Sequence, residues 1–305
     1  MPRLSYLLSL TPRETWRIAR RRLPGLRGGP AWTACELMSS PKHARGIRFA
    51  ELLDRQEAIA ARHMDWTPLE FEGRRVVEIG CGPLAGFGPL AIFRGAARFE
   101  SAEPEWDPAL LRDPAVVDTY LRVFHADLVA LYGPRMDFAT FRAALDERLS
   151  IHRCGFESAP IEGAVDIVLS QSVLEHVFPL DDTVARLAAI QSPQTRFLHL
   201  VDLGNHYPTV GPFDGLYEGP PEAYIARRGK AINLLRAPDI AEIFAAHGID
   251  AALIPARILP GGVSERVAPW WLERYDDAAL STQLVLVVGP GTLSPYDTAA
   301  RDGAA

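Results

Sequence analysis

The sequence feature that most constrains the fold is the alternation of short apolar runs with segments of helical periodicity. The runs are five to eight residues long, and most have consecutive apolar residues rather than one at every second position. Strands covered by helices on both faces have this pattern, because neither face meets water. The pattern predicts an α/β fold with a doubly wound, mainly parallel, seven-stranded sheet. The predicted strands are Arg75–Ile79, Arg98–Glu103, Ile151–Phe156, Val165–Ser170, Arg196–Leu203, Ala251–Ile258 and Gln283–Val288.

The segments between the runs have the spacing of amphipathic helices. The stretch from about residue 108 to residue 149 is too long for a simple crossover between strands, and we interpret it as a helical insertion. Its two helical segments are Val116–Tyr132 and Phe138–Leu149. The other predicted helices are Gly46–Met64, Phe87–Arg94, Asp181–Ile190, Pro238–His247 and Trp270–Leu280.

The ends of the chain differ from its centre. We predict a basic N-terminal arm and helical lid over residues 1–66, a main domain over 67–290 and a flexible tail over 291–305. The first 30 residues hold seven arginines and one acid, Glu14, so a basic helix lying on an anionic membrane surface is one interpretation. We favour a solvated arm or a lid, because the segment is only weakly amphipathic.

Composition excludes several functional classes. A net charge of −6 argues against nucleic acid as an obligate partner, since such proteins carry a basic excess. Three widely spaced cysteines form neither a disulfide framework nor a zinc pattern. No apolar run approaches the ~20 residues of a membrane span, and no signal peptide is evident. We therefore expect a cytoplasmic protein.

A glycine-rich turn follows the first predicted strand and opens a helix. Gly80, Gly82 and Gly86 allow the backbone to approach a ligand with no Cβ in the way. Glu78 stands just before the first of them, where a carboxylate repels a pyrophosphate but receives an ammonium, directly or through water. Pro83 also removes a backbone donor that an anion would need.

An acid that accepts ribose hydroxyls is expected about 20 residues after such a turn. Glu103 has this position, with Glu105 as the alternative. S-adenosylmethionine combines an ammonium with an adenosyl ribose, so it is the ligand we predict. The rival ligand is a nicotinamide dinucleotide, which the carboxylate of Glu78 and the missing third glycine spacing oppose.

Two segments together resemble the class I (Rossmann-like) S-adenosylmethionine-dependent methyltransferases. They are Glu78-Ile79-Gly80-Cys81-Gly82 and Val165–Val177, which ends in Leu-Glu-His-Val. The resemblance implies an antiparallel hairpin of the last two strands, Ala251–Ile258 and Gln283–Val288. The cofactor-binding residues that we assign are Glu78, Gly80, Cys81, Gly82, Gly86, Glu103, Pro104, Ser170 and Gln171, with Glu157, or alternatively Ser158, reaching the adenine amino group.

A narrower likeness concerns His199–Tyr207 and Asn233–Arg236, which resemble a bacterial methyltransferase subgroup of largely unassigned substrate. That subgroup is associated with surface-glycan or small-metabolite pathways. The resemblance therefore implies a small-molecule or glycan-precursor acceptor.

Two histidines follow predicted strands on the side of the expected cleft. His176 and His206 are candidates for the base that removes a hydroxyl proton, and Asp202 is placed to orient His206. The alternatives are a loop-tethering role for His176 and a capping role for His206.

A metal ion is not expected. In ubiquinone-biosynthesis O-methyltransferases the related segment supplies a further glutamate that helps to bind a divalent metal, and here Ser172 stands in that position. Glu175 and His176 alone would be a sparse ligand set. We therefore expect full activity in EDTA.

The function predicted from the sequence is O-methylation of a small molecule or glycan precursor with S-adenosylmethionine as donor. The alternatives are a nicotinamide-dependent oxidoreductase and a non-catalytic S-adenosylmethionine-binding protein. The segment Tyr207–Gly229, rich in glycine and proline, is predicted to be a loop that forms a lid or a substrate wall. Its aromatic residues are Phe213, Tyr217 and Tyr224. The nearby basic residues could receive an anionic or sugar-phosphate substrate, but we favour a solvated charged face; they are Arg227, Arg228, Lys230 and Arg236.

Overall fold

The computed structural model describes residues 33–38, 48–206, 211–263 and 266–290. The basic segment 1–32 and the tail 291–305 lie outside the described residues, and so do residues 39–47. The predicted membrane contact or solvated arm falls on the first of these segments. Within the part of the chain that is described, no helix combines the length and the apolarity needed to cross a bilayer.

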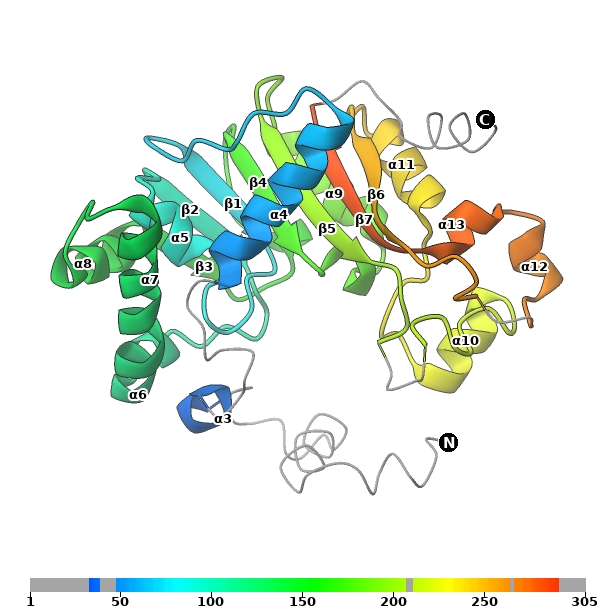
Figure 1. Cartoon of the computed structure of the whole chain (residues 1–305), viewed down its shortest axis with the longest axis horizontal. Helices are drawn as coiled ribbons and strands as arrows, with labels where there is room; N and C mark the ends of the chain where they lie inside the picture. Colours follow the sequence, from blue (N-terminus) through cyan, green and yellow to red (C-terminus); the bar gives the residue numbers. More distant parts are fainter. Residues whose placement is uncertain (1–32, 39–47, 207–210, 264–265, 291–305) are drawn as a thin grey trace.

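The centre of the molecule is one seven-stranded sheet with the order β3-β2-β1-β4-β5-β7-β6 (Figure 1). Strands β1 to β5 pair in parallel, and β7 pairs antiparallel with both β5 and β6. The prediction of a doubly wound sheet with an antiparallel last strand is therefore confirmed. The strands are β1 (Arg75–Ile79), β2 (Arg98–Ala102), β3 (Leu149–His152), β4 (Ile167–Gln171), β5 (Arg196–Asp202), β6 (Ala252–Ile258) and β7 (Thr282–Gly289).

One predicted strand was placed too late in the sequence. β3 begins at Leu149 and ends at His152, whereas the apolar run suggested Ile151–Phe156. Pairing with β2 sets these bounds, because Phe99 lies opposite Leu149 and Ala102 lies opposite His152. Phe156 instead begins the short 3₁₀ turn η5 (Phe156–Ser158).

Helices cover both faces of the sheet, and α4 lies across one of them (Figure 1). The insertion predicted between the second and third strands is present as a group of helices and turns at one end of the molecule. It comprises η3 (Leu110–Arg112), α6 (Pro114–Val116), the π-helical turn η4 (Val117–Leu121), α7 (Arg122–Tyr132) and α8 (Phe138–Arg148). The other predicted helices correspond to α4 (Arg48–His63), α5 (Gly88–Phe93), α9 (Leu180–Ile190) and α11 (Ala237–Ala246), and α3 (Ala34–Met38) precedes them.

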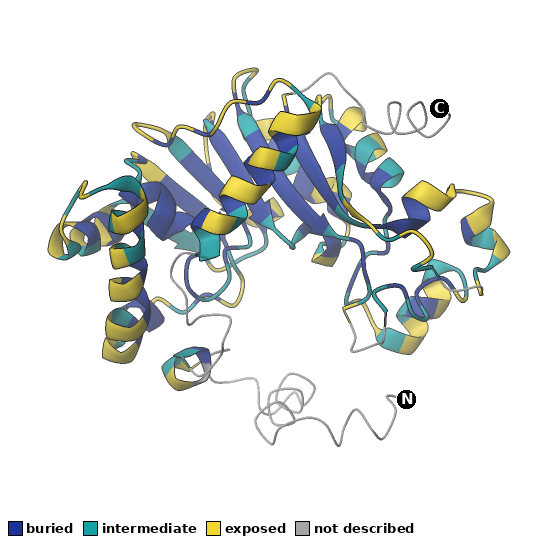
Figure 2. Ribbon diagram, viewed as in Figure 1, coloured by how far each residue is buried: buried dark blue, intermediate teal, exposed yellow. Residues whose placement is uncertain are grey.

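Successive residues of each central strand enter different hydrophobic cores, because side chains alternate between the faces of a sheet. Val76 and Leu169 pack in a core with α4, α5, α7 and α8, whereas Val77 and Val168 pack with α9 and α11. The strands are buried and the outer sides of the helices are exposed (Figure 2). Because helices shield both faces of the sheet from water, the strands appear in the sequence as nearly continuous apolar runs.

The predicted glycine- and proline-rich loop contains a helix that the sequence reading missed, α10 (Pro221–Arg228). Proline at a first helical position and a left-handed glycine just beyond the end are both helix signals, and Gly229 has φ +79°. The single helix predicted over Trp270–Leu280 is two helices, α12 (Pro269–Leu272) and α13 (Asp277–Ser281). The break arises because Asp276 caps the second helix by accepting the Ala279 N–H at 2.7 Å.

These three helices enclose a third hydrophobic core, which corrects the idea of an aromatic substrate wall. Phe213, Tyr217 and Tyr224 are buried there together with Trp271. Tyr217 and Trp271 meet edge to face with ring centroids 4.9 Å apart. These rings stabilise the small subdomain and are not available to a ligand.

Buried Arg236 ties this subdomain to the sheet. Its guanidinium donates to the Leu203 carbonyl and to the Tyr217 hydroxyl, each at 2.9 Å. The Tyr217 hydroxyl in turn donates to the carbonyl of Leu280 at 2.7 Å. Arg236 is 1% exposed, so for this residue both interpretations, a contact with an anionic substrate and a solvated charged face, are wrong.

His199 provides a test of the core. It is fully buried on β5, its Nδ1 lies 2.9 Å from Ser170 Oγ, and burial lowers its pKa to about 3. Between that value and the ordinary one near 6.5 the unfolded chain binds the proton and the folded chain does not. This group alone should therefore lower the free energy of unfolding by about 1.4 kcal/mol for each pH unit below 6.5.

The variant His199→Asn keeps a hydrogen-bonding group near Ser170 but does not titrate. We expect it to be less stable than the wild type near neutral pH and to lose less stability on acidification. Urea unfolding from about pH 6.5 to about pH 4.5 measures this difference. His63→Asn, at an exposed position of α4, should keep the wild-type slope. Equal slopes for all three proteins would contradict the assignment.

Candidate functional site

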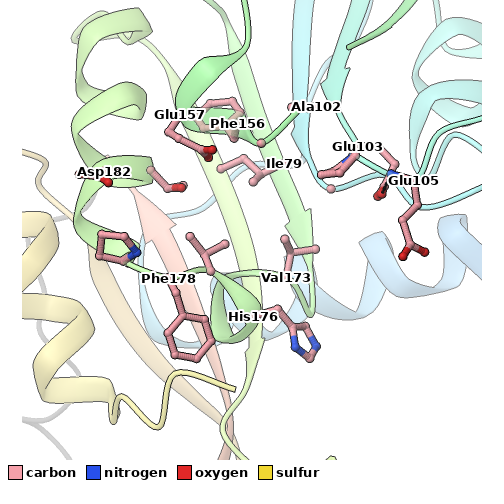
Figure 3. A pocket seen from close by; sticks show the side chains of 16 residues that line it. Ile79, Ala102, Glu103, Glu105, Phe156, Glu157, Val173, His176, Phe178 and Asp182 are labelled. Atoms are coloured by element: carbon pink, nitrogen blue, oxygen red, sulfur yellow. Dashed lines mark hydrogen bonds between the residues drawn. The ribbon is translucent and has the colours of Figure 1, made fainter. Parts of the chain in front are cut away.

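A cavity of about 680 Å³ opens at the carboxyl ends of β1, β2 and β4. The strand order changes direction between β1 and β4: the sheet continues from β1 to β2 on one side and from β4 to β5 on the other. Ligands of doubly wound sheets bind at such a switch point. The lining residues are Ile79, Gly80, Ala102, Glu103, Pro104, Glu105, Gly155, Phe156, Glu157, Val173, His176, Val177, Phe178, Pro179, Asp182 and Thr183 (Figure 3).

The glycine turn after β1 forms one wall of this cavity. Gly80 has φ +69°, and a Cβ there would lie 2.8 Å from both Cγ atoms of Val173. Any side chain would therefore meet both backbone strain and a steric clash. Gly82, at φ +65°, donates its N–H to Oε2 of Glu103 at 2.9 Å.

Glu103 lies directly after β2 and joins the turn to the neighbouring loop. Its second carboxylate oxygen, Oε1, accepts the N–H of Glu105 at 3.0 Å. The two backbone donors fix the carboxylate at the cavity wall. Because a carboxylate oxygen accepts more than one hydrogen bond, each oxygen retains capacity for a ligand hydroxyl. This is the position predicted for the ribose-binding acid.

Glu78 does not line the cavity, which argues against its predicted direct contact with an ammonium group, and contact through water stays a prediction. It is one residue before Ile79, which lines the cavity, so its side chain points to the opposite face of the sheet. The carboxylate is 1% exposed and accepts the N–H of Phe87 at 2.8 Å, and burial raises its pKa well above the ordinary value. A Cβ on Gly86 would lie 2.3 Å from Glu78 Oε2. Glu78 and Gly86 thus support the glycine turn from the side away from the cavity.

Five other residues assigned to the cofactor also lie outside the lining, and two of them are Gly82 and Gly86 of the turn. Cys81 is buried beneath the turn, where burial raises the pKa of its thiol. Ser170 is fully buried against His199, and Gln171 bonds to Gln56 of α4. The structure thus brings Gly80, Glu103, Pro104 and Glu157 to one cavity, whereas Glu78, Cys81, Gly82, Gly86, Ser170 and Gln171 surround or support it.

The sequence reading missed several lining residues, among them Phe156, Val173, Phe178 and Asp182. Asp182 stands in the first turn of α9, where an acid is a common helix-start residue and gives no separate signal of a site. In Figure 3, Glu157 and Asp182 lie on one side of the cavity, and Glu103 and Glu105 lie on the other. None of the described lining residues is lysine or arginine.

The two predicted histidines lie side by side. His176, in the 3₁₀ turn η6 (Leu174–His176), lines the cavity, and its Nδ1 lies 2.6 Å from the Ala231 carbonyl. A carbonyl only accepts, so Nδ1 carries a proton, and in the neutral form of the ring the lone pair is on Nε2. The His206 ring centroid is 4.7 Å from that of His176. Asp202 Oδ2 is 3.7 Å from His206 Nε2, which is longer than a hydrogen bond.

Glu175 is the unexpected member of this group. It is 2% exposed, and neither carboxylate oxygen has a hydrogen-bond partner among the described residues. Its Oε1 lies 3.9 Å from His206 Nε2. Burial raises the pKa of Glu175 to about 8, whereas the backbone amides of Glu175 and Asp202 lower it by less. Burial also lowers the pKa of His206, with a smaller contribution from His176.

No known family pattern matches the sequence, and a search of curated proteins finds no match. Solved structures do resemble the chain. An S-adenosylmethionine-dependent methyltransferase from Mesorhizobium loti is 14% identical over 77% of this chain and 98% of its own, with a TM-score of 0.42. Geranyl diphosphate C-methyltransferase from Streptomyces coelicolor is 14% identical over 83% and 86%, with a TM-score of 0.43. Phosphoethanolamine N-methyltransferase 2 from Haemonchus contortus is 15% identical over 81% and 57%, with a TM-score of 0.42.

Proposed function

We propose that this protein is an S-adenosylmethionine-dependent methyltransferase. The observation that carries the proposal is the charge of the cavity, which has four carboxylates and no lysine or arginine among its described lining residues. Such a wall opposes a dinucleotide, whose diphosphate is anionic, and favours a ligand that is cationic and rich in hydroxyl groups. S-adenosylmethionine has a sulfonium, an ammonium and a ribose.

Five residues of the cavity would hold this cofactor. The carboxylate of Glu103 would accept the two ribose hydroxyls, and Gly80 would let the backbone approach the methionine portion. Glu157 would accept the adenine amino group, beside Pro104 and the apolar surface of Phe156. Glu78 and Gly86 would act indirectly, by holding the turn in shape.

The acceptor that we propose is a hydroxyl of a small molecule or glycan precursor. Bound S-adenosylmethionine supplies a methyl group already activated by its sulfonium. His176 lies in the wall of the same cavity, and Nε2 of its neutral ring would take the hydroxyl proton as the oxygen attacks in line. The ring of His206 packs against that of His176, and Asp202 is near His206. His206 would therefore support His176 rather than contact the cofactor.

The variant His176→Gln tests this role. We expect it to lower kcat by about 100-fold or more, because a positioned base contributes a factor of this order. The dissociation constant for S-adenosylhomocysteine should stay within about threefold of the wild-type value, since the cofactor's ribose is held elsewhere. An unchanged kcat, or a loss of cofactor affinity equal to the loss of kcat, would contradict the assignment.

The function itself is tested by incubating the full chain with S-adenosylmethionine that carries a deuterated methyl group. A panel of phenols, catechols and sugar nucleotides serves as acceptors, and mass spectrometry locates the label. The proposal predicts a labelled methyl ether and S-adenosylhomocysteine in equal amounts. Label on nitrogen or carbon would overturn O-methylation alone. Cofactor binding without transfer would favour a non-catalytic binding protein, and NAD(P)H binding would favour an oxidoreductase.

A further inference from the structure

The carboxylate of Glu175 is buried next to His176, which lines the cavity, and only the nearby backbone amides of Glu175 and Asp202 partly offset the cost of burial. Both oxygens of Glu175 are buried and lack a hydrogen-bond partner among the described residues. The only ion-pair contact found for this side chain in that part of the protein is the one with His206 at 3.9 Å. Removing an ionised carboxylate from water without a partner is costly, so such a group takes up a proton, pairs with a cation or binds a metal ion.

Two imidazoles converge on the same point. One potential ligand atom from each of Glu175, His176 and His206 lies within 4.8 Å of the others. Ligands about 2.1 Å from a shared ion are about 3 to 3.5 Å apart, so a small rotation of the His206 side chain, which is 25% exposed, would complete the set. The Ala231 carbonyl fixes the ring of His176 through Nδ1 and leaves Nε2 free, as in metal-binding histidines.

The turn that carries two of these residues is held rigidly by Asn233. The amide of Asn233 donates to the carbonyls of Leu174 and Val177, at 2.8 and 3.2 Å. Its backbone N–H also donates to the Glu175 carbonyl, at 2.7 Å. Three bonds from one residue leave the position of η6 little freedom, and preorganised ligands of this kind favour metal binding.

We propose that Glu175, His176 and His206 bind a divalent first-row transition-metal ion such as Zn²⁺. Two imidazoles and one carboxylate favour this class over Mg²⁺ or Ca²⁺, which prefer oxygen ligands throughout. The sequence-based expectation of metal independence counted only Glu175 and His176, and the structure adds His206 from the loop after β5.

Ion binding does not depend on the proposed methyl transfer, but the role of the ion does. Three protein ligands leave a coordination position open, and His176 lines the cavity. An acceptor hydroxyl bound there would lose its proton to water more readily, and its oxygen would then attack the methyl group. With the ion in place, the ion would take over the task assigned above to the free Nε2 of His176.

The test is a calorimetric titration of the untagged, EDTA-treated full chain with ZnCl₂, combined with the absorption spectrum of the Co²⁺ form. We expect one ion per chain and the visible bands of a low-coordinate Co²⁺ site. Glu175→Gln and His206→Gln should each weaken binding by about 100-fold or more. His152→Gln is the matched control, because His152 Nε2 also lies 3.9 Å from a buried carboxylate, that of Glu100, but without a second imidazole.

The possible outcomes separate this inference from the proposed function. If the wild type binds no ion, or if Glu175→Gln binds as tightly as the wild type, the metal site is overturned. S-adenosylhomocysteine binding measured on the same metal-free sample reports on the proposed function independently. Thermal unfolding with and without ZnCl₂ guards against misfolded variants, since the ion should raise Tm for the wild type and His152→Gln but not for Glu175→Gln.

Discussion

Replacing Glu103 with alanine is expected to weaken S-adenosylhomocysteine binding by about 100-fold or more. The side chain would accept two ribose hydroxyls, and hydrogen bonds to a charged group contribute about 1.5 to 3 kcal/mol each. It also fixes the turn, because its two oxygens accept the N–H groups of Gly82 and Glu105. Isothermal titration calorimetry of the wild type and the variant measures the loss directly.

Glu105→Ala is the matched control for Glu103→Ala. Glu105 lines the same cavity two residues away, so removing its carboxylate changes the charge of the cavity by the same amount. We expect a loss of affinity below about tenfold, since only general attraction is weakened. If the two variants lose affinity equally, Glu103 has no specific role and charge alone accounts for binding.

Gly80→Val is expected to abolish measurable S-adenosylhomocysteine binding. Its left-handed backbone costs about 1 to 2 kcal/mol for any residue with a Cβ, and a β-branched side chain costs more. The added Cβ would also lie 2.8 Å from the Cγ atoms of Val173, which lines the cavity. The turn and the cavity wall would both have to shift, so calorimetry should show no binding heat.

Two further variants separate a failed site from a failed fold. Gly73 has φ +67°, and nothing lies within 4 Å of a Cβ added there, so Gly73→Val introduces similar backbone strain without a clash and outside the cavity. This variant should still bind S-adenosylhomocysteine. Gly80→Ala combined with Val173→Ala removes the clash but keeps the strain, so it should recover part of the affinity lost in Gly80→Ala. Binding by Gly80→Val close to that of the wild type would contradict the placement of the ligand beside this turn.

The alternation of apolar runs and helical segments was enough to predict the sheet, the insertion and most helices. The runs around Val77 and Val168 are continuous because both faces are covered, and that physical cause is visible in composition. The helix Pro221–Arg228 was missed because its glycine- and proline-rich surroundings suggested a loop. Its leading proline and trailing glycine were usable helix signals.

The candidate site was only partly predictable. Alternation along β1 means that Glu78 and Ile79 face opposite sides, but the sequence does not show on which side the cavity lies. The convergence of Glu175 and His176 with His206 depends on β4 and β5 being neighbours in register, with Gln171 opposite Leu200. Register is a long-range property, and no local pattern contains it.

The most direct measurement of the central claim is a pair of calorimetric titrations of the wild-type chain, one with S-adenosylhomocysteine and one with NADH. An acidic cavity closed by Glu103 and the glycine turn should bind one S-adenosylhomocysteine per chain and give no heat with NADH. Binding of NADH without binding of S-adenosylhomocysteine would contradict the account.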